Sequence, residues 1–270
     1  MVNDVTAINP ELPPPVPEKR VWGGWATFGL GIVILMIYGI VQTVVALVGL
    51  VVLWLQRASF SGVPYDDLVN GVMDVFRGNM GLLQSLATII SGIAGIGLVA
   101  LFIKARGRAG FAEYLGLRRF RAREMLLVFV IVIIFLALSA GLSFWTGADD
   151  QGNVMVDIYN SSVWPPLLWI AVVVFAPAFE EVFFRGFLFE GFRQSPVGSA
   201  GAIIFTSVAW ALLHALQYGL VTLASIFILG VVMGVVRLKT KSLWNTIVMH
   251  ALVNIVGMLE IALNIDKLFR

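Results

Sequence analysis

The stretch "WPPLLWIAVVVFAPAFEEVFFRGF", residues 164–187, decides what kind of fold this chain has. Its first fifteen residues carry no charge. Glu180 and Glu181 then stand side by side, and Arg185 follows four residues after the second. An apolar run of this length predicts a helix that enters a membrane. Ionisable residues in such a helix are costly, so they indicate either an ion pair or a functional site.

The composition of the whole chain agrees with a membrane protein. Of its 270 residues, 59% are hydrophobic and 13% are charged, whereas an ordinary globular domain is roughly 25% charged. The formal net charge of +2 is small, so we expect no nucleic-acid partner. The chain has no cysteine, which excludes disulfides, thiolate catalysis and thiolate metal sites.

Apolar segments long enough to cross a bilayer recur along the chain. A crossing helix needs roughly 20 residues, and the pattern predicts an all-α, polytopic transmembrane helix bundle. The first apolar run is longer than one crossing needs, so we interpret it as one tilted or protruding helix. The seven predicted spans are 25–55, 81–103, 125–146, 164–190, 199–217, 219–238 and 242–263.

Basic residues are unevenly distributed between the two ends of these spans. Loop 104–123 holds seven of them, and cytoplasmic loops carry an excess of lysine and arginine. With this loop inside, 14 of the 18 basic residues are cytoplasmic. We therefore predict a multi-pass protein of the cell (inner) membrane. Residues 1–20 form a disordered cytoplasmic tail, 21–146 the N-terminal membrane helices, and 147–270 the C-terminal membrane helices with the functional core.

Two pairs of small residues predict close contact between helices. Gly230 and Gly234 form a GxxxG motif, and Ser91 and Gly95 form a similar pair. Small residues at this spacing let helix backbones approach each other in membranes. Packing within the bundle is the favoured interpretation, and the oligomeric state is left open.

The charged residues of the opening stretch have two interpretations. Glu181 and Arg185 are spaced i,i+4 with the acid first, which favours a helical ion pair. Glu180 points about 100° away from Glu181 on a helix, so it has no such local partner. It is either a cavity-lining acid or a general base for water.

The only two histidines of the chain, His214 and His250, both fall inside predicted spans. Asn254 follows His250 at i+4, so the two share one helix face. Each histidine alone could be a packed, hydrogen-bonded side chain. Two histidines and the unpaired Glu180, on three helices, could also converge in the bundle interior, which is where helix bundles build their sites.

These residues belong to three motifs that occur in the order of a known family. "EEVFFRG" (180–186), "WALLH" (210–214) and "FILGVVMGVVRLKTKSLWNTIVMHALVN" (227–254) resemble the CAAX protease and bacteriocin-processing family (CPBP, or Abi). Its members are intramembrane endopeptidases related to the type II CAAX prenyl endopeptidase. The resemblance covers roughly residues 164–257. Trp210 stands where the family usually has phenylalanine.

The resemblance implies hydrolysis of a peptide bond within or at the membrane. The depths of Glu180 and His250, counted along their helices from the cytoplasmic end, predict a site that opens toward the cytoplasmic side. Glu180 is implied to activate water together with His214. His250 and Asn254 are implied to stabilise the oxyanion. The supporting residues that the resemblance implies are Glu181 and Arg185.

A metal-independent mechanism is the favoured prediction, with no cofactor. The chain has no HExxH motif, and Asn254 is a poor zinc ligand. The alternative is a Zn²⁺ ion held by Glu180, His214 and His250, with one position left for water.

The expected partners are the lipid bilayer and a membrane-associated protein or peptide substrate. The alternative function is a non-catalytic membrane scaffold or a bacteriocin self-immunity factor that binds a partner peptide. A small transporter is disfavoured, because the polar residues concentrate in the C-terminal half and are not mirrored in both halves.

Overall fold

The computed structural model describes residues 21–61, 68–107, 109–119, 121–147 and 153–263, and every regular element in these ranges is helical. The elements are α1 (Gly24–Ser61), α2 (Leu68–Gly78), α3 (Met80–Arg106), α4 (Phe111–Leu115), α5 (Ala122–Thr146), α6 (Asn153–Asn160), α7 (Pro165–Ile170), η2 (Ala171–Phe175), α8 (Ala176–Glu181), η3 (Val182–Leu188), α9 (Phe189–Arg193), α10 (Gly198–Leu213), α11 (Leu220–Thr240) and α12 (Leu243–Ala262). The segments η2 and η3 are π-helical. The predicted tail, 1–20, lies outside the described residues.

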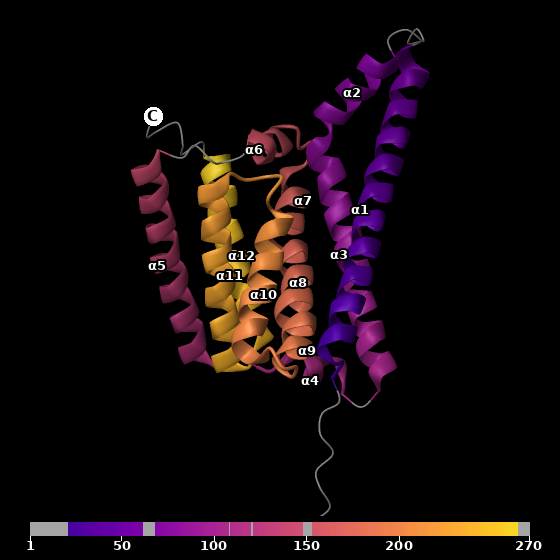
Figure 1. Ribbon diagram of the computed structural model, residues 1–270. Helices are drawn as coiled ribbons and strands as arrows, with labels where there is room; N and C mark the ends of the chain where they lie inside the picture. Colours follow the sequence, from indigo (N-terminus) through magenta and orange to yellow (C-terminus); the bar gives the residue numbers. More distant parts are fainter. Residues whose placement is uncertain (1–20, 62–67, 108, 120, 148–152, 264–270) are drawn as a thin grey trace, which may run out of the picture.

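The helices form an upright bundle (Figure 1). Among the described residues, six helical stretches are long and apolar enough to cross a membrane, and α10 is a shorter apolar helix beside them. The prediction of an all-α polytopic bundle is therefore confirmed. The division into N-terminal and C-terminal sets of membrane helices stays a prediction.

Residues 165–193, here called the central rod, form one continuous helical column from α7 to α9. Helices α1, α3, α10, α11 and α12 all pack against it, whereas α5 contacts α11 and α12 at the edge of the bundle (Figure 1). Every residue from Val182 to Leu188 is buried. A helix that is apolar around its whole circumference is buried by its neighbours, and this places the charged residues of the rod in the bundle interior.

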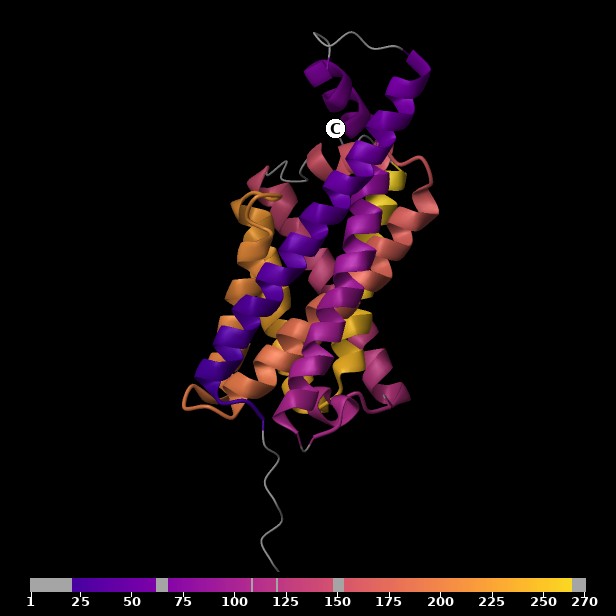
Figure 2. The same ribbon diagram turned by 90° about the vertical axis from the view of Figure 1, so that its right-hand side faces the viewer.

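Helix α1 is a single unbroken helix of 38 residues. At 1.5 Å per residue it is about 57 Å long, which exceeds the roughly 30 Å of a hydrocarbon core. Figure 2 shows that the C-terminal end of α1 and the following helix α2 project beyond the other helices. The predicted single, protruding helix is confirmed, and it ends later than the predicted residue 55.

Helix α10 is shorter than the predicted span 199–217. It ends at Leu213 with His214 as its C-cap, and turns follow up to residue 217. At 16 residues it is about 24 Å long, less than a full crossing. The predicted end was wrong because apolar composition continues beyond the residue at which the helical hydrogen bonds stop.

The connection between α3 and α5 packs against the turn between α11 and α12. The Leu243 N–H donates to Gly116 O at 3.0 Å, and Arg237 Nη2 donates to Leu115 O at 3.0 Å. Gly116 has a φ of +66°, which suits glycine at this helix end. The described basic residues of the connection, in 104–107, 109–119 and 121–123, therefore lie at the same end of the bundle as residues 237–241, as the predicted topology requires.

Both small-residue pairs lie at helix contacts inside the bundle. A Cβ atom added at Gly230 would meet Ser207 of α10 at 3.0 Å, and one at Gly234 would meet Ile203 at 3.1 Å. Ser91 is fully buried, and a Cβ at Gly95 would collide with the ring of Phe179. The prediction that these residues allow close packing is confirmed.

Gly95→Val is expected to destabilise the bundle by about 1–3 kcal/mol, the usual cost of inserting atoms into a packed core. The added atoms collide with Phe179, the residue next to Glu180. Gly97→Val on the same helix is the control, because no atom lies within 4 Å of a Cβ there. Thermal unfolding in detergent measures both, and equal shifts in Tm for the two variants would contradict this prediction.

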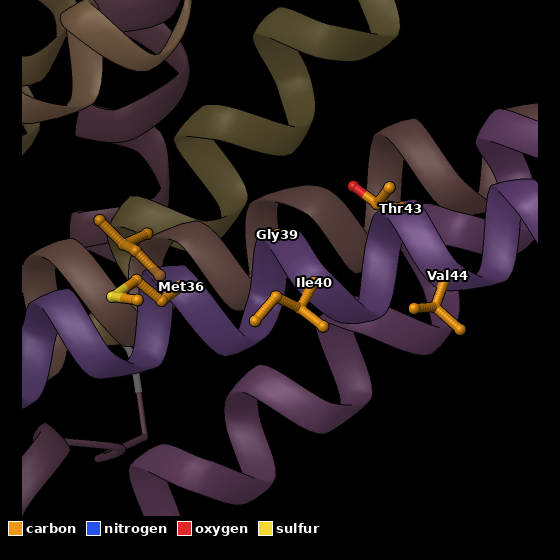
Figure 3. A pocket seen from close by; sticks show the side chains of 6 residues that line it. Met36, Gly39, Ile40, Thr43 and Val44 are labelled. Carbon is orange, nitrogen blue, oxygen red and sulfur yellow. The ribbon is translucent and has the colours of Figure 1, made fainter.

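A shallow groove of about 380 Å³ lies on the outer face of α1 (Figure 3). Met36, Ile40 and Val44 are all more than half exposed, and Figure 3 shows their side chains pointing away from the bundle. The residues that line the groove are Leu35, Met36, Gly39, Ile40, Thr43 and Val44. None of them is ionisable, so this groove belongs to the lipid-facing surface and not to the candidate site.

Candidate active site

The site is built around the last turn of α8, where Glu180 and Glu181 follow each other in the central rod. The π-helical segment η2 precedes α8 and η3 follows it directly. Single π-helical turns inside α-helices are frequently found at functional sites. The two carboxylates therefore lie in a short α-helical segment between two π-helical ones.

Glu181 is fully buried and forms the predicted ion pair with Arg185. Arg185 Nη1 donates to Glu181 Oε1 at 3.0 Å, and both side chains have no exposed surface. The guanidinium also lies over the ring of Trp210, 4.4 Å from the ring centroid. A buried charge needs such a partner, so the pair allows the rod to carry charge inside the membrane.

Glu181 has a second partner, which the sequence did not reveal. His250 Nδ1 lies 3.2 Å from the same oxygen, Glu181 Oε1. Because the paired carboxylate accepts hydrogen bonds, the proton belongs on Nδ1 of the imidazole. This orients the ring and turns its other nitrogen, Nε2, toward Glu180, 3.9 Å from Oε2. His250 thus faces both carboxylates, one with each ring nitrogen.

Glu180 has no arginine or lysine partner among the described residues. Trp210 Nε1 donates to its Oε2 at 2.5 Å. The side chain is 18% exposed, in contrast to the fully buried Glu181. Glu180 is therefore oriented by a neutral donor and remains able to accept a proton.

Trp210 contacts Glu180 and both histidines of the site, a role that the sequence did not predict. Besides its bond to Glu180, its ring makes edge-to-face contacts with His214 and His250, at centroid distances of 5.4 and 5.1 Å. The sequence held one signal of this role: position 210 is tryptophan, where the family usually has phenylalanine. An indole has an N–H that can donate a hydrogen bond, and a phenyl ring has none.

His214 lies at the C-terminal end of α10 and reaches Glu180 through Trp210. Its Nδ1 is 2.9 Å from the backbone oxygen of Trp210. A carbonyl oxygen can only accept, so Nδ1 carries the proton and Nε2 is left as the basic nitrogen. The ring also stacks on Tyr218 at a centroid distance of 6.2 Å.

Asn254 contacts the central rod at a different place. Its Nδ2 donates to the backbone oxygen of Val172 in η2 at 2.8 Å. His250 and Asn254 both point to the rod, as their shared helix face predicted. His250 binds the carboxylates of α8, whereas the amide nitrogen of Asn254 binds a main-chain oxygen.

The alternative of a zinc ion concerns the side chains of Glu180, His214 and His250. The ranges that the structure describes contain no group of three or more histidine, cysteine, aspartate or glutamate side chains that could hold a metal ion. His250 Nδ1 and Glu180 Oε2 are directed to protein partners, Glu181 and Trp210. The Nε2 atoms of His250 and His214 do not take part in these contacts, so the metal-independent mechanism and the zinc alternative both stay predictions.

The two adjacent carboxylates, Glu180 and Glu181, lie in different chemical environments. Glu181 is held as the buried partner of Arg185 and His250. Glu180, one residue earlier, is partly exposed and adjacent to an imidazole nitrogen. A carboxylate beside an imidazole nitrogen is a pair of groups that can activate water and, with a proton on the nitrogen, stabilise developing negative charge.

Comparison with known proteins gives a match over the same part of the chain. Residues 162–256 match the family model described as type II CAAX prenyl endopeptidase Rce1-like. An Escherichia coli protein described as an uncharacterized 24.3 kDa protein is 30% identical over 95 residues. That match covers 34% of this chain and 43% of the relative, so the chain spans less than half of the relative's length. No solved structure matches the chain.

The matched segment begins three residues before the central rod and ends within α12, so it contains all the site residues described above. These are Glu180, Glu181, Arg185, Trp210, His214, His250 and Asn254. Residues 162–256 therefore match the Rce1-like family of type II CAAX prenyl endopeptidases, in agreement with the family that the three motifs resemble.

Proposed function

We propose that this protein is an intramembrane endopeptidase that hydrolyses a peptide bond of a membrane-associated protein or peptide. The observation that carries the proposal is the environment of Glu180. It is the one of two adjacent carboxylates that forms no ion pair with an arginine or lysine among the described residues; Trp210 donates to it, and Nε2 of His250 lies 3.9 Å from it. The match to the Rce1-like family supports the same activity.

In the proposed reaction, Glu180 accepts a proton from a water molecule as the water oxygen attacks the scissile carbonyl carbon. The basic Nε2 of His214 assists in holding this water. The carbonyl oxygen becomes an oxyanion in the tetrahedral intermediate. Glu180 then returns the proton to the leaving nitrogen when the C–N bond breaks, so the carboxylate is regenerated and the water is consumed.

His250 is proposed to stabilise the oxyanion in its doubly protonated form. Glu181 accepts the Nδ1 proton, and in the proposed reaction Nε2 carries a proton as well. The Nε2–H is then a charged donor beside Glu180, where charge develops on the substrate. Glu181 and Arg185 support this arrangement without contacting the reacting atoms.

The proposed mechanism contains no metal step, and this can be tested directly. The assay uses purified protein in detergent and an internally quenched peptide that ends in a farnesylated CAAX sequence. Cleavage that persists after exhaustive chelation, with less than stoichiometric metal by elemental analysis, supports the carboxylate mechanism. Loss of cleavage that returns on adding Zn²⁺ would contradict it.

Natural substrates can be found by comparing membranes of cells that express the wild type or Glu180→Ala. Proteomics of protein N- and C-termini should reveal termini that are present only with the wild type. Identical termini in both samples would contradict an endopeptidase and would favour the alternative of a peptide-binding scaffold or self-immunity factor.

We further propose that the N-terminus is cytoplasmic and that the site opens toward the cytoplasmic side. The described basic residues of 104–123 share one end of the bundle with residues 237–241, which supports this orientation. Because the chain has no cysteine, Lys239→Cys and Val154→Cys each provide one reactive thiol. A membrane-impermeant maleimide should label only Val154→Cys in intact cells, and labelling of Lys239→Cys would reverse the orientation.

Trp210→Phe is expected to lower kcat for the quenched peptide about 10–100-fold, because a charge-assisted hydrogen bond contributes roughly 1.5–3 kcal/mol. The substitution removes the donor to Glu180 and keeps an aromatic ring beside His214 and His250. Trp244→Phe on α12 is the matched control, since Trp244 is 42% exposed. A kcat for Trp210→Phe equal to that of the control would contradict the orienting role of the indole.

A further inference from the structure

The backbone oxygen of Val172 in η2 has lost its partner within the helix. The N–H four residues later, that of Ala176, donates to Ala171 O in the π-helical pattern. The residue five positions later is Pro177, which has no N–H. Neither the α-helical nor the π-helical hydrogen bond to Val172 O is therefore made.

Asn254 supplies the missing donor from another helix. Its Nδ2 lies 2.8 Å from Val172 O, and α12 packs along both η2 and α8. Within a bilayer there is no water to satisfy a free carbonyl, and proline in a membrane helix is tolerated where a neighbouring helix supplies the lost partner. The contact thus compensates for Pro177.

The π-helical segment determines where the two carboxylates point. One extra residue in a turn rotates all following side chains by about 100° relative to a regular α-helix. Glu180 and Glu181 come five and six residues after the end of η2. The directions in which they meet Trp210 and His250 therefore depend on the π-helical register of residues 171–175.

The second π-helical segment is held in a similar way. Arg237 of α11 is 5% exposed, and its Nε donates to the backbone oxygen of Arg185 in η3 at 3.1 Å. A polar side chain from a neighbouring helix thus binds a carbonyl of the rod on each side of the carboxylates. The two contacts indicate that neighbouring helices stabilise the π-helical hydrogen-bond pattern of the rod.

We propose that Asn254 is a positioning residue. Its amide holds the carbonyl that Pro177 leaves free, which keeps η2 π-helical and so directs Glu180 and Glu181 into the site. The proposal rests on the proposed endopeptidase function, and it differs from the oxyanion role that the family resemblance implies for this residue. In this proposal, Asn254 acts through Val172 and does not touch the substrate.

The test is a double-mutant cycle of Asn254→Ala and Pro177→Ala. Alanine at 177 restores an N–H that can donate to Val172 O, so it replaces the function of the Asn254 amide. Tm in detergent is measured for all four proteins, together with kcat and KM for the quenched farnesylated peptide. Pro166→Ala is the control background, because Pro166 lies in the first turn of α7, where a helix N–H has no partner in the helix.

In the Pro177 background, Asn254→Ala should lower Tm by about 2–4 °C, the shift expected for one lost hydrogen bond. It should lower kcat about 100-fold, the cost of misplacing a catalytic group by an ångström, and leave KM unchanged. With Pro177→Ala both losses should shrink, kcat recovering at least about tenfold. In the Pro166→Ala background, the losses of Tm and kcat caused by Asn254→Ala should persist.

Two results would overturn the proposal. If the Tm loss from Asn254→Ala is the same with proline or alanine at 177, the proposed link through Val172 is wrong, whether or not the peptide is cleaved. If the Tm losses are coupled but kcat is not recovered, Asn254 acts on the reacting atoms and is not a positioning residue. Failure of the proposed function has a different signature, namely equal cleavage by wild type and Glu180→Ala.

Discussion

Glu180→Gln is expected to abolish peptide cleavage while the protein folds as before. Glutamine keeps the shape of the side chain and an oxygen that can accept the Trp210 hydrogen bond, but it cannot take a proton from water. Removing a general base typically costs 10²–10⁴-fold, so we expect a loss in kcat of about 10³-fold. Turnover of the quenched farnesylated peptide by purified protein measures this, with Tm as the check on folding.

The matched control is Glu113→Gln in α4, an exposed glutamate outside the central rod. It removes the same charge and should leave kcat unchanged. Cleavage by Glu180→Gln at the control's rate would refute the catalytic assignment. A cellular phenotype that survives in Glu180→Gln would instead support the peptide-binding alternative, because binding does not require proton transfer.

Arg185→Met is expected to prevent stable folding. It leaves the carboxylate of Glu181 buried without its cation, and removing one partner of a buried ion pair costs about 3–5 kcal/mol. That is a large fraction of a typical stability of about 5–15 kcal/mol. We expect little accumulation in the membrane and a strongly lowered Tm in detergent. Accumulation and a Tm equal to those of the wild type would contradict the structural role of the pair.

A second ion pair in the same rod provides the comparison. Arg193 and Glu190 are 2.6 Å apart, and their side chains are 36% and 13% exposed. Because solvent screens such a pair, Arg193→Met should cost only about 0–1 kcal/mol. The double variant Glu181→Leu/Arg185→Met removes both buried charges and should recover much of the lost Tm. It should still fail to cleave, because His250 has lost its acceptor.

The polytopic helical architecture was predictable because it depends on composition along the chain. The cost of placing polar groups in hydrocarbon decides which segments can cross, and the basic residues mark one end of the bundle. Helix ends were less predictable. The span 199–217 extended past Leu213 because its apolar side chains continue where the backbone hydrogen bonds of α10 end.

The candidate site was predictable at the level of residue types and local spacing. The i,i+4 pair Glu181–Arg185 follows from helix geometry alone. The shared face of His250 and Asn254 follows in the same way. The contact of His250 with both carboxylates did not follow, since it depends on how α12 is rotated and offset against α8.

By itself, the sequence determined that the chain is a helical membrane protein and that its rare ionisable groups concentrate in one part of it. The bilayer imposes that result on any chain of this composition. Only the tertiary structure decided the partners of each group: Trp210 for Glu180, His250 for Glu181, and Val172 O for Asn254. Such contacts join different helices and depend on a π-helical register, and neither is encoded in the spacing of residues along one helix.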